Sequence, residues 1–410
     1  HQTINISPKA KHYLQLEEKY GAHNYHPIPV VLNRGEGVFV WDVDDKRYYD
    51  FLSSYSAVNQ GHCHPKIVRV FLEQAQKLTL TSRAFHSDAM AEFAQFITSY
   101  FGYDKVLPMN TGVEAVETAI KLCRKWAYEV KGIETNKAVI IVCENNFHGR
   151  TTGVISFSSD PDAKNNFGPY MPGFEAIPYN DLAALEKALS NKHVAGFLVE
   201  PIQGEAGVYV PDECYLAAAK KLCEQANVLF IADEIQTGLA RTGKMLASEH
   251  ENVKPYILVL GKALSGGMLP ISAVLANDEI MLTIKPGQHG STYGGNPLAC
   301  KTAIASLQVL KDEKMADNAS AMGELLRKGL KKINSKHINI VRGKGLLNAI
   351  VIKHVNPDAA WELCLELKEN GLLAKPTHGD KIRFAPPLTI TKEQVQECIA
   401  IIDRSLHCLD

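Results

Sequence analysis

Short apolar segments recur through the middle of the chain, between about residues 106 and 274. Each is of strand length, and segments with helical periodicity separate them: 138–143, 194–199, 228–232, 256–260 and 271–275. Strands that are apolar on both faces and alternate with helices are typical of a parallel sheet covered by helices. The pattern therefore predicts an α/β fold. Ligands bind such sheets beyond the carboxyl ends of the strands, so the residues directly after each segment are candidate site residues.

The two ends of the chain have a different pattern. Residues 37–50 are typical of a β-hairpin with Asp44 and Asp45 at the turn, and a helix-rich tail after residue 303 contains one strand candidate at 346–353. We expect these ends to pack together as a smaller α+β domain. The predicted division is an N-terminal segment of the small domain at 1–55, a large sheet domain at 56–303 and a C-terminal small domain at 304–410.

Charge and cysteine usage exclude several classes of protein. The 410 residues include 44 Lys+Arg and 45 Asp+Glu, for a formal net charge of −1. Proteins that bind polyanions normally carry a basic excess, so nucleic acid and anionic membranes are not expected partners. Nine cysteines without a C-x-x-C pair indicate reduced thiols, and no apolar run is long enough to span a membrane. We expect a cytoplasmic protein, with the mitochondrial matrix as the alternative if a presequence has been removed before His1.

A capped helix is predicted to begin at Gly112. Thr111 and Glu114 form a capping box, and apolar residues continue at helical spacing to a stop at Gly132. The free N–H groups at the start of such a helix can hold a phosphate, and Gly112 allows a close approach to the backbone. An ordinary capped helix without a ligand is the alternative.

Two other motifs do not predict a ligand site. The segment from Gly238 to Met245 matches a nucleotide-binding loop until Met245, which replaces the hydroxyl side chain that binds Mg²⁺. His62 and His64 flank Cys63 in an extended segment, where neighbouring side chains point to opposite faces, and no paired Cys/His tract follows. We predict no metal site.

A carboxylate and a lysine follow two of the apolar segments. Asp233 comes directly after 228–232, and Lys262 comes just after 256–260. Each alone is compatible with a solvated strand end. Together with the helix at Gly112 they match what pyridoxal phosphate requires, namely a lysine amine, a carboxylate facing the pyridine nitrogen and a phosphate cradle.

Several further segments carry a family resemblance. They include Asp233-Glu-Ile-Gln-Thr-Gly238 and Leu260-Gly-Lys-Ala-Leu-Ser-Gly-Gly267, with 51–65, 146–151, 199–207 and 290–297. In this order they resemble class III, fold-type I pyridoxal-phosphate aminotransferases over nearly the whole chain. The resemblance implies the fold-type I architecture, with a large mostly parallel sheet domain and a smaller α+β domain built from both chain ends, and pyridoxal 5'-phosphate as the cofactor.

The resemblance also implies roles in cofactor binding. Lys262 holds the cofactor covalently and later moves a proton at the substrate carbon, and Asp233 keeps the pyridine nitrogen protonated. Phe147 stacks on the ring and Gln236 contacts the side of its phenolic oxygen. The remaining implied contacts are His148 and Ile235, with Gly112 and Val113 at the phosphate, and Ser291 and Thr292 reaching the phosphate of a neighbouring subunit in a homodimer.

The local contexts of Tyr55, Glu205 and Arg383 are similar to those of family members that use L-ornithine. The implied reaction passes the δ-amino group of L-ornithine to 2-oxoglutarate in ping-pong order. Its products are glutamate 5-semialdehyde and L-glutamate, which link it to proline and arginine metabolism. N-acetylornithine or 4-aminobutyrate as the substrate is the alternative, and a cofactor-binding regulator without turnover is another.

By the same resemblance, Arg150 and Arg383 bind the two carboxylates of the diacid. Glu205 pairs with Arg383 as a removable mask, and Tyr25 and Tyr55 contact the α-amino and α-carboxylate end of ornithine. A surface ion pair is the alternative reading of Glu205 and Arg383.

Overall fold

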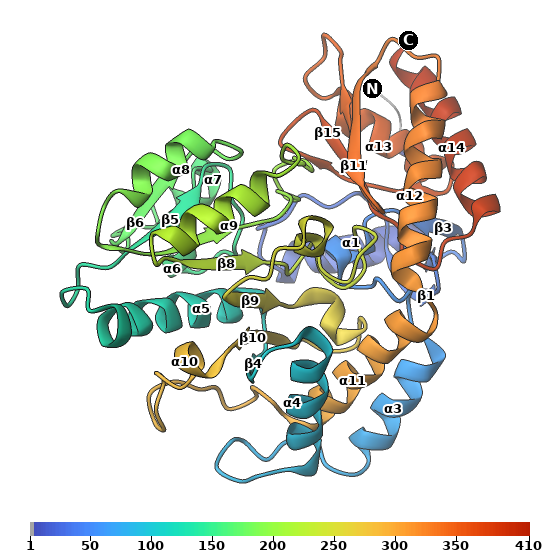
Figure 1. The fold of residues 1–410 in the computed structure, drawn as a ribbon. Coiled ribbons are helices and arrows are strands. Elements are labelled where there is room, and N and C mark those ends of the chain that lie inside the picture. Colours follow the sequence, from blue (N-terminus) through green and yellow to red (C-terminus); the bar gives the residue numbers. More distant parts are fainter. Residues whose placement is uncertain (1–3) are drawn as a thin grey trace.

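A large mixed sheet forms the centre of the molecule (Figure 1). The structure is a computed structural model and describes residues 4–410. The strand order is β4-β10-β9-β8-β7-β5-β6, with β4 at Lys105–Met109, β5 at Val139–Cys143, β6 at Phe174–Ile177, β7 at Val194–Val199, β8 at Leu229–Asp233, β9 at Ile257–Leu260 and β10 at Ser272–Ala276. Every apolar segment predicted as a strand forms one.

The direction of one strand differs from the prediction. Strands β5 to β9 are parallel to one another, whereas β10 is antiparallel to both β9 and β4. A parallel crossover needs about a dozen residues or more. The connection from β9 to β10, residues 261–271, contains a 3-10 turn and no helical crossover. The antiparallel β10 leaves β4 running in the same direction as β9, so the helix after β4 begins at the same sheet edge as Lys262.

Helices cover both faces of this sheet, as the alternation of side chains along β5 shows. Ile140 and Val142 pack on the side of α5 (Gly112–Trp126), whereas Ile141 and Cys143 pack on the side of α8 (Leu182–Leu189) and α9 (Tyr215–Gln225). Near β9 and β10, the covering helices are α3 (Pro65–Ala75), α4 (Asp88–Phe101) and α11 (Pro297–Asp312). The α5 helix begins with the predicted capping box and continues as a π-helical turn, Ala127–Lys131, to Gly132.

The two chain ends share a second sheet. The hairpin of β2 (Phe39–Asp42) and β3 (Arg47–Asp50) pairs with β1 (Leu32–Glu36) on one side and, through β3, with the parallel strand β13 (Leu372–Leu373) on the other. The expectation that the ends pack together is confirmed. The boundaries at residues 55 and 303 stay a prediction.

A third sheet belongs wholly to the C-terminal region. Its order is β11-β12-β15-β14, with β11 at Ile338–Lys344, β12 at Leu347–Ile352, β15 at Lys381–Phe384 and β14 at Pro376–Thr377. Only β12 was predicted. The remaining helices are α1 (Pro8–Tyr20), α6 (Thr152–Ile155), α7 (Pro161–Lys164), α10 (Asp278–Met281), α12 (Met315–Lys332), α13 (Ala359–Glu369) and α14 (Lys392–Leu406), with 3-10 turns at Ala247–Glu251, Lys262–Ser265 and His407–Leu409.

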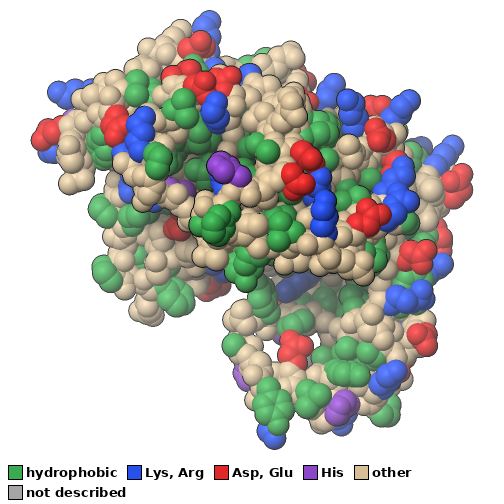
Figure 2. All heavy atoms as spheres, turned by 90° about the horizontal axis from the view of Figure 1, so that it is seen from below, with side chains coloured by type: hydrophobic (Ala, Val, Ile, Leu, Met, Phe, Trp, Pro, Cys, Tyr) green, Lys and Arg blue, Asp and Glu red, His purple; other side chains and the backbone are tan. Residues whose placement is uncertain are grey.

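The surface agrees with the balanced composition. Basic and acidic side chains are interspersed over the face drawn in Figure 2, without a large area of one sign. Within residues 4–410, no helix combines the length and the apolar character that a membrane span requires.

The segment α2, Ser53–Ser56, is a left-handed turn. Its four residues have φ angles of 51°, 49°, 59° and 75°. Left-handed backbone costs a residue with a side chain roughly 1–2 kcal/mol. Asp50 Oδ1 holds the turn by accepting from the backbone N–H of Leu52 at 2.9 Å and of Ser53 at 2.8 Å, and the Ser53 hydroxyl donates to the carbonyl of Ala385 at 2.7 Å. The turn thus fixes the backbone of Tyr55.

Replacing Ser54 with glycine should stabilise the protein. Ser54 is exposed with φ 49°, and glycine would remove strain of roughly 1–2 kcal/mol while adding about 0.5–1 kcal/mol of unfolded-chain entropy. We expect the free energy of unfolding to rise by about 0.5–1 kcal/mol, measured by urea unfolding. Ser99→Gly is the matched control, because Ser99 is exposed in the right-handed helix α4. That variant should be destabilised by about 0.5 kcal/mol, and equal shifts in both variants would contradict the strain.

Candidate active site

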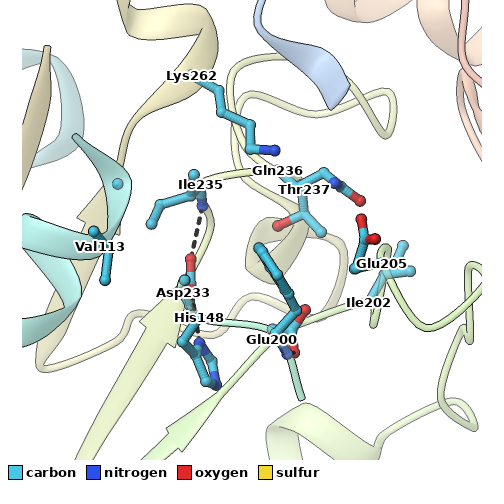
Figure 3. Close-up of a pocket in the computed structure, with 13 residues that line it drawn as sticks. Val113, His148, Glu200, Ile202, Glu205, Asp233, Ile235, Gln236, Thr237 and Lys262 are labelled. Carbon is cyan, nitrogen blue, oxygen red and sulfur yellow. Dashed lines mark hydrogen bonds and ion pairs between the residues drawn. The ribbon is translucent and has the colours of Figure 1, made fainter. Parts of the chain in front are cut away.

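A cavity of about 240 Å³ lies at the carboxyl edge of the large sheet (Figure 3). Residues that follow β5, β7, β8 and β9 line it, together with the first residues of α5. The predicted site residues in its wall are Gly112, Val113, Phe147, His148, Glu205, Asp233, Ile235, Gln236 and Lys262. A wider cleft, called the outer cleft below, adjoins this cavity. Arg150 and Glu205 are among the residues that line it, and it shares Phe147 and His148 with the cavity. The sheet thus brings most of the predicted cofactor residues to one place.

Lys262 is a buried amine at the start of the 3-10 turn after β9. Burial lowers its pKa to about 8, and the nearby guanidinium of Arg383 contributes in the same direction. Its side chain points into the cavity (Figure 3). Because the neutral amine is the nucleophilic form, an amine with a pKa near neutrality suits covalent attachment and proton transfer.

Asp233 ends β8 and is fixed by two hydrogen bonds. Oδ2 lies 2.6 Å from Nδ1 of His148, and Oδ1 accepts from the backbone N–H of Ile235 at 3.0 Å. Burial lowers the pKa of His148, but the hydrogen bond to Asp233 and its charge raise it, and the net shift is upward. The imidazole of His148 is therefore more readily protonated beside this carboxylate. Nε2 of His148 is buried and has no hydrogen-bond partner within residues 4–410.

The N-terminus of α5 faces the same cavity. Thr111 caps it by accepting from the N–H of Glu114, and a side chain at position 112 would crowd Ile235, with its Cβ only 3.1 Å from Ile235 Cδ1. Ser291 lies beside this terminus, where its hydroxyl accepts from Asn110 Nδ2 at 2.8 Å, and Thr292 is exposed. The N–H groups of α5 are thus placed to bind an anion.

Arg383 forms an ion pair with Glu205, which lines both the cavity and the adjoining cleft. Arg383 Nη1 lies 3.0 Å from Glu205 Oε2, and their side chains are 5% and 24% exposed. The pair is therefore not a surface ion pair, which was the alternative from the sequence. Arg383 Nε is buried and has no hydrogen-bond partner among the described residues 4–410.

Tyr55 lies between this ion pair and the lysine. The centre of its ring is 4.9 Å from Arg383 Cζ and 5.2 Å from Lys262 Nζ. Burial raises the pKa of its phenol, so the hydroxyl stays protonated at neutral pH. Arg150 Cζ lies 5.7 Å from the ring centre of Phe147. Tyr25 is 65% exposed, and its ring contacts Lys375 Nζ at 5.9 Å, so Tyr25 lies further out than Tyr55.

Comparison with known families decides the class of this site. The family model of class-III aminotransferases matches residues 20–406. The chain belongs to the class-III aminotransferases. It is therefore a pyridoxal-phosphate-dependent transaminase.

Individual relatives of this aminotransferase are similar over nearly their full length. Mitochondrial ornithine aminotransferase of rat is 60% identical, covering 97% of this chain and 91% of the relative. A structure of Toxoplasma gondii ornithine aminotransferase, described with partial occupancy of PLP at its active site, has a TM-score of 0.96 at 49% identity and covers 98% and 94% of the two chains. A structure of acetylornithine aminotransferase from Elizabethkingia anophelis has a TM-score of 0.90 at 60% identity and covers 97% and 99%.

The cavity of this aminotransferase fits the cofactor of its class. Lys262 supplies a buried amine, Asp233 a fixed carboxylate and α5 an anion-binding terminus. Gln236 Oε1 is buried and has no hydrogen-bond partner in the part of the chain that the structure describes, as expected of a group whose partner is a ligand. The donor set at the sheet edge therefore matches pyridoxal phosphate on its own chemistry.

Four residues that line the cavity were missed in the sequence, namely Gly149, Glu200, Ile202 and Thr237. Glu200 follows β7 as Asp233 follows β8, so its position after a buried strand was an available signal. Its carboxylate accepts from the N–H of Phe147 at 3.0 Å, and burial raises its pKa to about 8. Ile202 and Thr237 carry no such signal.

Proposed function

We propose that this aminotransferase transfers the δ-amino group of L-ornithine to 2-oxoglutarate. The products are glutamate 5-semialdehyde and L-glutamate, formed in two half-reactions with ping-pong order. The semialdehyde links the reaction to proline and arginine metabolism.

The ion pair of Arg383 with Glu205 carries the proposal. A diacid needs two cationic groups, whereas the far end of ornithine carries both a carboxylate and an ammonium group. With the pair closed, Glu205 neutralises Arg383 and the cavity accepts an amine donor. With the pair open, Arg383 and Arg150 are two guanidinium groups for the two carboxylates. The unpartnered Nε of Arg383 supports a further acceptor at this site.

The proposed chemistry at the reacting carbon depends on two residues. Bound pyridoxal phosphate supplies an electron sink that stabilises negative charge at the substrate carbon. Lys262 would hold the cofactor covalently and, once substrate has displaced it, would take and return the proton at that carbon. Asp233, held by His148 and Ile235, would face the pyridine nitrogen. Tyr55 and Tyr25 would contact the α-carboxylate and α-ammonium end of ornithine, and Phe147 would exclude water from one face of the ring.

The names of the relatives support ornithine as the donor, since the rat and Toxoplasma proteins are ornithine aminotransferases. The structure from Elizabethkingia anophelis, also 60% identical, is described as an acetylornithine aminotransferase and supports N-acetylornithine as the second candidate. The two donors differ in the charge of the α-nitrogen.

Product identification separates these candidates. Purified holoenzyme is given 2-oxoglutarate with L-ornithine, N-acetylornithine or 4-aminobutyrate, and each aldehyde is identified by mass spectrometry. We expect glutamate 5-semialdehyde from L-ornithine as the fastest product. Faster turnover of either other donor would overturn the proposal, and no turnover of any donor would favour a regulator that only binds the cofactor.

Replacing Tyr55 with isoleucine should lower the preference for ornithine. The phenol lies beside Arg383 and Lys262, where it can hydrogen-bond the α-ammonium group of ornithine, which 4-aminobutyrate lacks. We expect the ratio of kcat/KM for ornithine over 4-aminobutyrate to fall about tenfold, the effect of a lost hydrogen bond to a charged group. Tyr209→Ile, at a partly exposed tyrosine elsewhere in the outer cleft, serves as the control. An unchanged ratio in Tyr55→Ile would remove Tyr55 from donor recognition.

Assembly and compartment are part of the proposal. We propose a homodimer in which Ser291 and Thr292 contact the cofactor phosphate bound by the partner subunit. Sedimentation of the purified protein would measure its assembly. The cytoplasm stays a prediction, and the mitochondrial label of the rat relative supports the matrix as the alternative. Fractionation of cells that express the full chain would decide between the two.

A further inference from the structure

Opening the Arg383–Glu205 pair leaves one carboxylate without a partner. This inference rests on the proposed function, in which both carboxylates of a diacid bind Arg150 and Arg383. Glu205 is only 24% exposed, and an unpaired carboxylate in such a position is destabilised. Either Glu205 takes up a proton, or a cation of the cleft other than Arg383 pairs with its carboxylate.

Lys375 lies next to Glu205 in the fold. It stands between β13 and β14 and lines the outer cleft together with Glu205 and Arg150. Two residues further on, the hydroxyl of Thr377 donates to the backbone carbonyl of Glu205 at 2.8 Å. The segment from Lys375 to Thr377 is therefore hydrogen-bonded to the backbone of Glu205.

The ammonium group of Lys375 has no hydrogen-bond or ion-pair partner within residues 4–410. The contact of its Nζ is the ring of Tyr25, at 5.9 Å. Burial lowers the pKa of this amine, Glu205 raises it and Arg383 lowers it, so the amine responds to both members of the pair. Lys375 is thus a half-buried lysine without an acceptor, and it lies beside a carboxylate that has to change partners. Its ammonium group is available to form an ion pair with that carboxylate.

We propose that Lys375 is a positioning residue that receives the carboxylate of Glu205 when a dicarboxylate takes Arg383. The charges then balance at each stage. With ornithine bound, Arg383 pairs with Glu205. With the diacid bound, its two carboxylates pair with Arg150 and Arg383, and Glu205 pairs with Lys375.

The other cations of the cleft are already occupied. Lys381 Nζ is paired with Asp380 at 2.7 Å. Arg150 is assigned to the second carboxylate of the diacid, and Lys262 to the cofactor. Among the lysines and arginines that line the two cavities, Lys375 is thus the one without an assigned acceptor.

The test is the affinity of the holoenzyme for glutarate, a diacid that cannot react, measured by calorimetry, with the KM for 2-oxoglutarate as a second readout. Four variants are compared with the unmodified protein: Lys375→Gln, Glu205→Gln, the double variant and Lys381→Gln. The last is the matched control, because it removes the same charge from the same cleft. Melting temperatures verify that each variant folds, and Lys375→Arg should rescue the affinity.

We expect Lys375→Gln to weaken glutarate binding about tenfold, or roughly 1.4 kcal/mol, and Lys381→Gln to weaken it less than twofold. In the Glu205→Gln background, Lys375→Gln should have less than a twofold effect, because no carboxylate then needs a new partner. An equal loss in both backgrounds would mean that Lys375 attracts the diacid directly and would overturn the inference. No loss in either background would overturn it as well.

Failure of the proposed function is recognised separately. Glu205→Gln alone should tighten glutarate binding, since it removes the mask from Arg383. If it does not, the mask itself is wrong, whatever Lys375 does. If glutamate 5-semialdehyde is not formed from ornithine, the donor is wrong, and the glutarate result still tests Lys375 as the acceptor of Glu205.

Discussion

Replacing Lys262 with alanine should lower kcat at least about 10⁴-fold and abolish the absorbance band of covalently held cofactor. Both effects come from one buried amine, whose lowered pKa of about 8 leaves a usable neutral fraction near neutrality. A positioned acid–base group alone contributes about 10²–10⁴-fold, and the loss of covalent attachment adds to it. Absorbance spectra of the variant incubated with pyridoxal phosphate, and single-turnover rates with ornithine, measure the two effects.

Two controls make this result specific. Lys221→Ala removes an exposed lysine of α9 and should leave both the band and the rate unchanged. A small primary amine added to Lys262→Ala should restore part of the rate, because it can occupy the vacated space and carry the proton. A band that persists in Lys262→Ala would show that another lysine holds the cofactor.

Replacing Asp233 with asparagine should lower kcat about 10²–10³-fold, the usual effect of removing one preorganised electrostatic partner. The substitution keeps the shape of the side chain, and an amide oxygen can still accept from the N–H of Ile235. The negative charge proposed to face the pyridine nitrogen is lost, and the NH2 group that replaces Oδ2 cannot accept from Nδ1 of His148. Single-turnover rates in both half-reactions should fall together, since both need the protonated ring.

His148→Gln tests whether the charge of Asp233 matters more than the hydrogen bond between Asp233 and His148. It removes the 2.6 Å hydrogen bond to Asp233 and leaves the carboxylate with the N–H of Ile235. We expect a loss of about tenfold, the scale of a hydrogen bond to a charged group. A rate of Asp233→Asn within threefold of the unmodified protein would assign the pyridine nitrogen to another acid, for which Glu200 in the cavity wall is a candidate.

The positions of Asp233 and Lys262 could be predicted from the sequence, because each is set by the strand that directly precedes it. Asp233 and Lys262 each follow a buried strand, and parallel strands place their carboxyl ends at one edge. The capping box at Thr111 is likewise a short-range signal, and the structure has both of its hydrogen bonds. These residues needed no knowledge of distant parts of the chain.

The substrate side depended on contacts that periodicity does not report. Arg383 lies on β15, far in sequence from Glu205, and their pairing was implied only by the family resemblance. The left-handed turn at Tyr55 contains four residues with side chains and no glycine, so it has no sequence signature. The two-residue strand β13 is too short for any pattern. The direction of β10 followed from the length of a connection rather than from the strand itself.

The shared sheet of the two chain ends also orders events during synthesis. The strands that carry Asp233 and Lys262 are complete once residue 276 has left the ribosome. The segment that leads into Tyr55 still lacks two partners at that stage, since the N–H of Phe51 donates to the carbonyl of Leu373 and the N–H of Ala385 donates to the carbonyl of Phe51. Under the proposed roles, a nascent chain therefore has Asp233 and Lys262 at the ends of finished strands well before the segment of Tyr55 has its partners.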